Sequence, residues 1–410
     1  MIVAWCGCSP APRPARSGRL RAGSGDGVRR AEVVWLRRRA CRGVAALRLS
    51  RESPQFASNE SVAVDATGAE HSHPRQLRER IEFLPLDGLP RLLRAPLVLL
   101  KFSRPHTILG SAVSIVSLTL MGALSVASGP VCATTAFWMR YLSVLMVALV
   151  PSMLMNVYIV GLNQVFDVSI DRVNKPYLPL ASGELSVRAG ASIAVTSLVA
   201  ALALGFALPL TTTALRVALI LSALIGTAYS LPPVRLKRFA LLASLCVLCV
   251  RGAVINLGFF AHALLGLSAS PLLVAHKFTP VIRFATAFFV LFGVVIALMK
   301  DIPDVRGDRA HQLRSFSVRF GERRVFWFCV STLVGMYAAA AVACLTPWLA
   351  TRSLVRSAAG SLAHLGMGAW LLRRSVRVRE EEGNPSAVYD FYMDVWTCFY
   401  LEYLVLPLLC

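Results

Sequence analysis

Membrane-length apolar segments constrain the fold of this chain more than any other feature. Nine of them lie near residues 104–127, 142–165, 189–208, 212–231, 239–262, 281–300, 325–347, 354–372 and 392–409. A helix needs about 20 mostly apolar residues to cross the hydrocarbon core of a bilayer. Hydrophobic residues make up 56% of the chain, and they are concentrated in these segments. The sequence therefore predicts an all-α, polytopic membrane bundle of about nine transmembrane helices.

The first 60 residues differ in composition from everything that follows. Residues 1–51 contain twelve arginines, no lysine and only two acidic residues, Asp26 and Glu32. An Arg-rich, acid-poor segment that contains serine is typical of a mitochondrial or chloroplast transit peptide. A disordered basic tail, or a genome that favours arginine codons, would give the same composition. We expect 1–60 to be an organelle-targeting segment, 61–95 a polar linker with room for a short surface helix, and 96–410 the transmembrane domain.

The formal net charge of +21 does not require a nucleic-acid partner, because the cations follow the membrane topology. Loops after the even-numbered segments carry seventeen Lys and Arg residues, and loops after the odd-numbered segments carry six. By the positive-inside rule the richer set faces the cytosol-like compartment, together with the N-terminus. In an organelle that compartment is the stroma or the matrix. We expect the chain to interact mainly with the lipid bilayer, and we expect neither nucleic acid nor an obligate protein as a partner.

An acidic cluster ends the second apolar segment, in "GLNQVFDVSIDRVNKP" from Gly161 to Pro176. Asn163, Asp167 and Asp171 are spaced four residues apart, so on a helix they share one face over two turns. Asn174 follows eleven residues after Asn163, close to the same angular position.

A second acidic cluster follows the sixth segment, in "KDIPDVRGDR". Asp301, Asp304 and Asp308 would also share one face if this stretch were helical. Pro303 and Gly307 indicate instead that its later part is a loop or a distorted helix end. Both clusters end even-numbered segments, so the predicted topology places them on the same side of the membrane.

Five carboxylates and an amide at one membrane boundary need cations to offset their repulsion. Oxygen ligands of this kind suit Mg²⁺, which usually shares its coordination with substrate phosphates. The spacing therefore predicts Mg²⁺ ions that bridge the carboxylates to a diphosphate. Solvated loop charges are the simpler interpretation. A cation transporter is another, but it would place its ionisable groups near the bilayer midplane rather than at segment ends.

Basic residues near the two clusters complete a predicted diphosphate site. Arg104 opens the first apolar segment, Lys175 follows the first cluster, and Lys237 follows "AYSLPP". Arg251 lies well inside the fifth segment, where an unpaired charge is costly and usually functional. The other loop cations are equally well explained as determinants of topology.

These motifs resemble those of a known family. "NQVFDVSIDRVNKP" and "KDIPDVRGD" are similar to the two aspartate-rich motifs of the UbiA-type intramembrane prenyltransferases, and the resemblance extends from about residue 95 to the C-terminus. "FSRPHTILGSAVSIVSL", "PYLPLASGELS" and "SFSVRFGERRVFW" are similar to the plastid branch of that family that prenylates homogentisate in tocopherol synthesis. Gln164 departs from the acidic residue that chlorophyll synthases of the superfamily have after the Asn of the first motif.

The resemblance implies a helical bundle around a central cavity that opens sideways to lipid, and dependence on Mg²⁺. Carried over by position, it assigns metal-ligating roles to Asn163, Asp167, Asp171, Asp301, Asp304 and Asp308. Of these acids it implies a catalytic role for Asp167, Asp171, Asp301 and Asp308. We expect the substrates to contact Arg104, Lys175, Lys237, Asn174, Tyr229 and Arg251. Tyr229, His106 and Asn256 are the candidates for orienting the acceptor ring or accepting its proton.

The implied activity is transfer of a phytyl group from phytyl diphosphate to homogentisate, with decarboxylation. The implied location is a plastid membrane, with the active-site face towards the stroma. Transfer of a solanesyl or geranylgeranyl group is the alternative within the family. A membrane carrier of cations or lipid diphosphates is the alternative of another class. A CDP-alcohol phosphotransferase would also use Asp and Mg²⁺, but in one continuous motif, whereas these clusters stand far apart in the sequence.

Overall fold

A computed structural model describes residues 90–127, 134–268, 279–346, 349, 353–381 and 384–409. All of them belong to the second of two compact units, Gly68–Cys410. The predicted targeting segment 1–60 and most of the predicted linker 61–95 lie outside the described residues. Within the described residues all regular structure is helical, as the sequence predicts.

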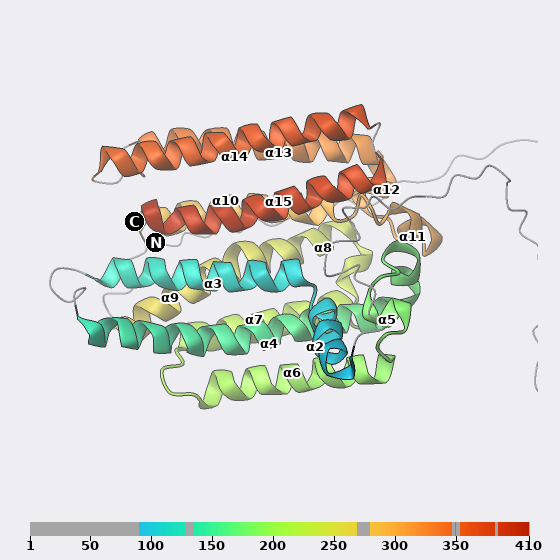
Figure 1. Cartoon of the computed structure of the whole chain (residues 1–410), viewed down its shortest axis with the longest axis horizontal. Helices are drawn as coiled ribbons and strands as arrows, with labels where there is room; N and C mark the ends of the chain where they lie inside the picture. Colours follow the sequence, from blue (N-terminus) through green and yellow to red (C-terminus); the bar gives the residue numbers. More distant parts are fainter. Residues whose placement is uncertain are drawn as a thin grey trace, which may run out of the picture. The chain divides into compact units, whose positions relative to one another are not determined.

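Long helices run side by side through the domain (Figure 1). They are α3 (Pro105–Val126), α4 (Thr135–Asn174), α6 (Val187–Ala207), α7 (Thr213–Ser230), the continuous rod α8 (Ala240–Val247), η4 (Leu248–Val254) and α9 (Ile255–Leu267), α10 (Pro280–Met299), α13 (Glu322–Leu345), α14 (Leu354–Glu380) and α15 (Pro385–Val405). Each of the nine predicted segments coincides with one of these described rods.

Short elements connect the rods. They are α2 (Arg91–Phe102), α5 (Pro179–Ser182), η3 (Leu236–Arg238), α11 (Val305–Ala310), α12 (Phe316–Phe320) and η7 (Leu406–Leu409). Figure 1 shows α2, α5, α11 and α12 gathered at one end of the long helices. We refer to this end, where α4 and α10 finish, as the site end.

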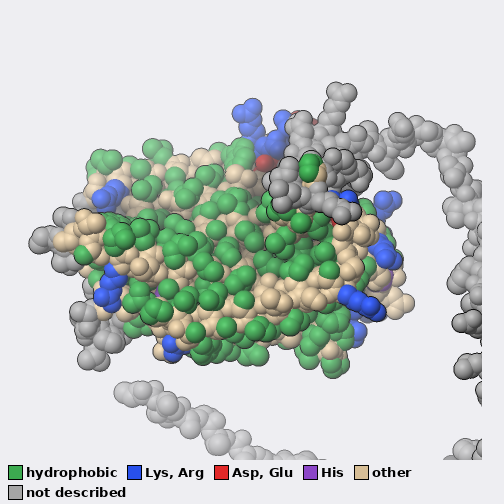
Figure 2. All heavy atoms as spheres, turned by 60° about the horizontal axis from the view of Figure 1, so that its bottom comes forward, with side chains coloured by type: hydrophobic (Ala, Val, Ile, Leu, Met, Phe, Trp, Pro, Cys, Tyr) green, Lys and Arg blue, Asp and Glu red, His purple; other side chains and the backbone are tan. Residues whose placement is uncertain are grey.

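Seven of the described rods are long and apolar enough to cross a membrane: α3, α4, α6, α7, α8–α9, α10 and α13. The described α14 and α15 do not meet that standard, because the apolar part of α14 is diluted by glycine, serine and histidine and α15 contains Asp390, Asp394 and Glu402. Nine crossings therefore stay a prediction. Figure 2 shows a broad apolar band on one face of the domain, with Lys and Arg side chains at its two ends, as expected for a surface in contact with lipid.

Polar side chains fix where several of the helices begin. Thr134, Ser186 and Thr212 accept hydrogen bonds from the backbone amides of Phe137, Ala189 and Leu215 and so cap α4, α6 and α7. At 1.5 Å per residue, α4 is about 60 Å long, twice the thickness of a hydrocarbon core. Helix α4 extends beyond the predicted segment 142–165, and its last turns carry the first acidic cluster.

Two polar residues near the C-terminal end of α15 face inward. Glu402 is fully buried and lies 3.1 Å from Nε2 of His364 on α14, while Tyr403 stacks on Phe289 of α10 with ring centroids 3.9 Å apart. The N-terminal half of α15 reaches the site end, where it brings Tyr392 and Trp396 next to α3 and η4. A helix too polar to be an obvious membrane span is thus part of the core.

The fifth rod is not a uniform α-helix. Residues Leu248–Val254 form the π-helical stretch η4, with Arg251 at its centre. Gly252 packs directly on α10, because a Cβ there would lie 2.7 Å from the Cα of Val290. Wide turns of this kind are frequent at functional sites.

Candidate functional site

A cavity of about 1770 Å³ opens at the site end. It is lined by α3, α4, α7, η3, the α8–η4–α9 rod, α10, α11 and α15, and it receives both acidic clusters. Its polar walls belong to the ends of α4 and α10, and its deeper walls are apolar, including Ile115, Met155, Ile159, Leu219 and Phe259. Such a cavity can hold a molecule with a strongly anionic head and a long apolar tail.

The first cluster lies on α4, as the four-residue spacing predicts. Asn163, Asp167 and Asp171 all line the cavity. Asp167 accepts hydrogen bonds from Arg235, at 2.9 Å, and from Lys237. The Oδ2 atom of Asp171 is buried and has no hydrogen-bond partner among the described residues. Buried carboxylate oxygens are rarely left unpaired, so Asp171 is open to a ligand.

The second cluster is not one helical face. Helix α10 ends at Met299, Asp301 follows in a turn, and α11 begins only at Val305. Asp301 pairs with Lys300 at 2.7 Å, while Asp308 lies on α11 and is 8% exposed. Burial raises the pKa of Asp308 to about 6, because removal from water penalises the charged carboxylate. The break between α10 and α11 confirms the distorted helix end that Pro303 and Gly307 indicated.

Two contacts join the clusters directly. Lys175, just after α4, lies 2.5 Å from a carboxylate oxygen of Asp304. Asn174, the last residue of α4, accepts a hydrogen bond of 2.8 Å from the backbone amide of Gly307. The prediction that both clusters lie on the same side is confirmed. Asn174 lines the cavity, and its side-chain oxygen also holds the two motifs together. The substrate contact expected of it stays a prediction.

The predicted basic residues surround the same end of the cavity. Arg104 occupies the break between α2 and α3 with a positive φ of 52°. Burial alone would lower its pKa, but the carboxylates of Asp171 and Asp304 contribute to an opposing effect that raises it. Burial lowers the pKa of Lys237 to about 8, although Asp167 acts in the opposite direction. The ammonium of Lys237 also lies 5.9 Å above the ring of Tyr229, which lines the cavity.

Two cations of the site were not singled out in the sequence. Arg235 and Lys300 bind Asp167 and Asp301 in the structure, yet in the sequence they counted only as determinants of topology. Lys300 directly precedes the second cluster, and that adjacency was the available signal. Arg235 follows "SLPP", and its position depends on the turn that precedes η3.

The ring-orienting candidates divide into two groups. His106 and Tyr229 line the cavity. Asn256 does not line the cavity: it is fully buried, donates to the carbonyls of Arg251 and Gly252, and accepts from the hydroxyl of Tyr403 at 3.2 Å. Asn256 therefore supports the backbone of η4, and its assignment as a candidate for the acceptor ring was wrong.

The carboxylates are not gathered into a preformed metal cluster. Among the described residues no group of three His, Cys, Asp or Glu side chains is arranged to hold an ion. The lysines and arginines occupy the space between them instead. The site thus alternates cations and carboxylate oxygens around one opening, which suits a polyanion accompanied by divalent cations.

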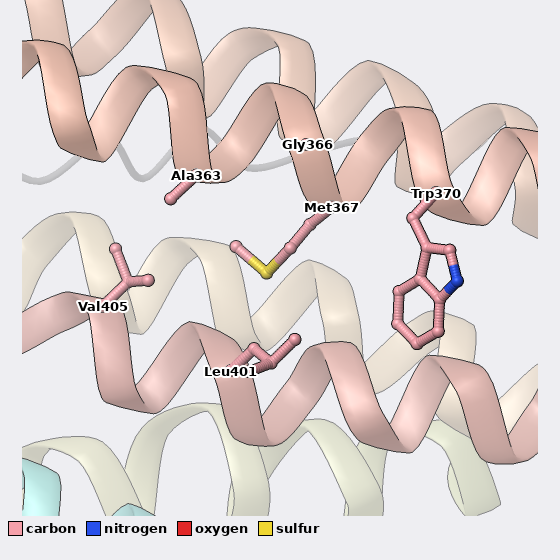
Figure 3. Close-up of a pocket in the computed structure, with 6 residues that line it drawn as sticks. All are labelled: Ala363, Gly366, Met367, Trp370, Leu401 and Val405. Carbon is pink, nitrogen blue, oxygen red and sulfur yellow. The ribbon is translucent and has the colours of Figure 1, made fainter.

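A second, smaller hollow of about 320 Å³ lies between α14 and α15. Figure 3 shows Met367 and Trp370 of α14 and Leu401 and Val405 of α15 along its sides. Its lining contains no charged side chain and none of the predicted site residues. The large cavity is therefore the candidate functional site.

Comparisons with known proteins identify related sequences. A sequence model described as the UbiA prenyltransferase family matches residues 108–396. The probable homogentisate phytyltransferase 1 of Oryza sativa is 42% identical over 316 residues, which are 75% of this chain and 72% of the relative. The Arabidopsis thaliana homogentisate phytyltransferase 1 is 41% identical over 75% of this chain and 74% of its own length. A homogentisate geranylgeranyltransferase of Triticum aestivum is 39% identical over 75% of this chain and 71% of that relative.

Proposed function

We propose, from the premise that this chain belongs to the UbiA prenyltransferase family, that it transfers a phytyl group from phytyl diphosphate to homogentisate with loss of CO₂. One observation carries the proposal: both acidic clusters, together with Arg104, Lys175, Lys237 and Lys300, face a single cavity whose deeper walls are apolar. The two relatives that are 41–42% identical and are named homogentisate phytyltransferases support the choice of substrates.

The residues at the opening fit Mg²⁺. The predicted ligands Asn163, Asp167, Asp171, Asp301, Asp304 and Asp308 offer only hard oxygen donors, which is the set that Mg²⁺ prefers. The unpaired Oδ2 of Asp171 supports the presence of a further positive group beside it. When bound, Mg²⁺ would neutralise charge on the diphosphate leaving group. Assignment of individual ligands remains part of the proposal.

Cations of the chain bind the diphosphate oxygens. Arg104, Lys175 and Lys237 lie at the cavity opening, and each is near a carboxylate that keeps it in place. Arg235 and Lys300 add two more donors at the same end. Positive groups fixed in advance stabilise the charge that develops on a leaving group without reorganisation.

The bond changes follow from that arrangement. The C–O bond of phytyl diphosphate breaks, and its electron pair leaves with the diphosphate. A carbon of the electron-rich ring supplies the pair for the new C–C bond and then loses its proton. Loss of CO₂ from the side chain leaves an electron pair that takes up a proton and becomes a methyl group. Apolar walls such as Ile115, Met155 and Ile159 exclude water from the allylic cation.

Transfer of a geranylgeranyl group is the second candidate, supported by the wheat relative at 39% identity. The plant relatives named chloroplastic support a plastid membrane as the location. The excess of loop cations at the site end supports a stromal orientation of the cavity opening.

A competition assay tests the proposal. Purified full-length protein receives homogentisate, Mg²⁺ and equal amounts of phytyl, geranylgeranyl and solanesyl diphosphate, and the quinol products are separated by mass. We expect the methyl-phytyl-benzoquinol to dominate. A dominant geranylgeranyl or solanesyl product would show that phytyl diphosphate is not the preferred donor. Absence of any prenylated quinol, with transport of diphosphate into vesicles, would show that the protein is a carrier and not an enzyme.

A further inference from the structure

Arg251 stands apart from every other cation of the cavity. It lines the cavity from the centre of η4, inside an apolar span. The described part of the chain gives it no ion-pair partner, and its Nη1 atom is buried without a hydrogen-bond acceptor. A charge within a membrane span is costly unless it is paired. The guanidinium is therefore held ready for an anion that the protein itself does not supply.

Aromatic side chains fix the position of this guanidinium. Its central carbon lies 4.8 Å from the ring centroid of Trp396 and 5.8 Å from that of Phe399, both on α15. His106 of α3 also meets Trp396 edge-on, with centroids 5.2 Å apart. His106, Arg251 and Trp396 all line the cavity. Together they form an aromatic pocket with one cationic donor, which we call the Arg251 pocket.

The Arg251 pocket adjoins the diphosphate end but differs from it in the groups that surround its cation. The side chain of Tyr392 lies within electrostatic range of Lys300 and Arg104 and also of Arg251. The charged and titratable neighbours of Arg251 are tyrosines of α15, whereas Arg104 faces Asp171 and Asp304. Arg251 consequently has no carboxylate of its own to neutralise.

Two anionic substrates in one apolar cavity repel each other unless each has its own cation. Four cations line the opening for the diphosphate: Arg104, Lys175, Lys237 and Lys300. The acceptor is an aromatic acid, and its carboxylate needs a planar, two-pronged donor, which a guanidinium provides. Its ring needs flat apolar or aromatic surfaces, which Trp396 and His106 provide.

Resting on the proposed function, we propose that Arg251 binds the carboxylate of the aromatic acceptor and so selects acids over neutral hydroquinones. Trp396 holds the guanidinium in place. The acceptor ring then lies between Arg251 and the diphosphate end, where the allylic carbon forms. Arg251 is thus a specificity-determining residue for the acceptor rather than a ligand of the diphosphate.

The test compares homogentisate with its methyl ester, which has the same ring and no charge. Arg251→Met should raise the KM for homogentisate by about tenfold or more, the value of one strong charged contact. The KM for phytyl diphosphate should stay within about twofold, since that substrate uses other cations. With the methyl ester, wild type and Arg251→Met should have equal KM values. Arg251→Lys keeps the charge without the fork and should fall between them.

Arg216→Met is the matched control. Arg216 is also half-buried, lies over an aromatic ring (Phe206, 5.5 Å) and is outside the cavity lining. Its removal should leave both KM values unchanged. Thermal unfolding in detergent verifies that each variant is folded. If Arg251→Met does not fold, the KM values of Arg251→Lys test the inference instead.

Several results would overturn the inference. An equal rise in KM for phytyl diphosphate would make Arg251 a diphosphate ligand, and an equal loss with the methyl ester would make it a packing residue. Unchanged kinetics with homogentisate would overturn it outright. A wild-type protein that prenylates no homogentisate would instead refute the proposed function, so the two failures are distinguishable.

Discussion

Individual carboxylates in this site have different surroundings, although the sequence presents them as two similar triplets. Asp167 is held by Arg235 and Lys237, Asp301 by its neighbour Lys300, and Asp171 keeps one oxygen unpaired. Charged pairs of this kind are costly to break, because the partner is left as an uncompensated charge. The contribution of each Asp therefore includes the order it imposes on nearby cations.

Asp167→Asn should reduce kcat/KM by at least about 100-fold, because two donors lose their ionic partner and one proposed metal ligand is lost. The measurement is steady-state prenyl transfer across a Mg²⁺ titration, where the variant should need more Mg²⁺. Asp394→Asn is the matched control: Asp394 pairs with Arg374 at 2.5 Å and does not line the cavity. Equal losses in the two variants would contradict a special role for Asp167.

At the scale of elements, the site depends on how helix ends meet. The end of α4 contacts α11 through Asn174 and Gly307, and η4 contacts α10 through Gly252. Both junctions use a glycine at a close approach: an added Cβ would meet the Asn174 side chain at Gly307 and the Val290 backbone at Gly252. The geometry of the opening thus depends on residues that carry no charge.

A double-mutant cycle tests the first junction. Gly307→Ala would place a Cβ 2.4 Å from Oδ1 of Asn174, so this variant should unfold at a lower temperature and bind phytyl diphosphate more weakly. Asn174→Ala leaves the Gly307 amide without its acceptor, at a cost of about 1–3 kcal/mol. In the double variant the methyl group has room, so the combined loss should be smaller than the sum. Strictly additive losses of stability would argue against the contact.

The second junction should affect the acceptor more than the donor. In Gly252→Ala the new Cβ would meet the backbone of Val290 at 2.7 Å, and backbone moves less easily than a side chain. We expect η4 to move away from α10 by a few tenths of an ångström or more, with a lower melting temperature and a raised KM for homogentisate. Gly366→Ala, on a glycine of α14 with open space around it, is the control and should change neither quantity. A raised KM for phytyl diphosphate alone would be inconsistent with this prediction.

At the scale of the whole domain, the two ends of the long helices differ in charge. Both acidic clusters line the cavity at the site end, and the loops at that end carry more Lys and Arg residues than those at the opposite end, although Figure 2 shows basic side chains at both ends of the apolar band. A bilayer across the apolar band would leave the cavity opening at one membrane surface and its apolar depth among the lipid tails.

Labelling from one side of the membrane checks this orientation. In a variant whose native cysteines are replaced, Arg309→Cys lies at the site end and Thr213→Cys at the other end, where α7 begins. A membrane-impermeant maleimide added to sealed vesicles should label only one of the two positions, and permeabilised vesicles should label both. Labelling of both positions in sealed vesicles would refute the topology.

The sequence anticipates the parts of this architecture that depend on local pattern. Apolar length predicts the rods, and the spacing of Asn163, Asp167 and Asp171 predicts a helical face. The roles of Asn174, Asn256 and Lys300 depend on contacts with other elements, which spacing along one helix does not encode. The surroundings of Arg251 depend on α15, whose approach is visible only in three dimensions.

The π-helical stretch η4 has a consequence for how one span serves two neighbours. Each residue of an α-helix turns the chain by about 100°, so widened turns rotate everything that follows relative to what precedes. On one side of this offset, α8 and η4 lie against α10; on the other, α9 lies against α3. The faces that the two halves of the rod present are therefore rotated relative to each other. A one-residue deletion within Leu248–Val254 would remove this rotation, and the rod would lose its packing against either α10 or α3.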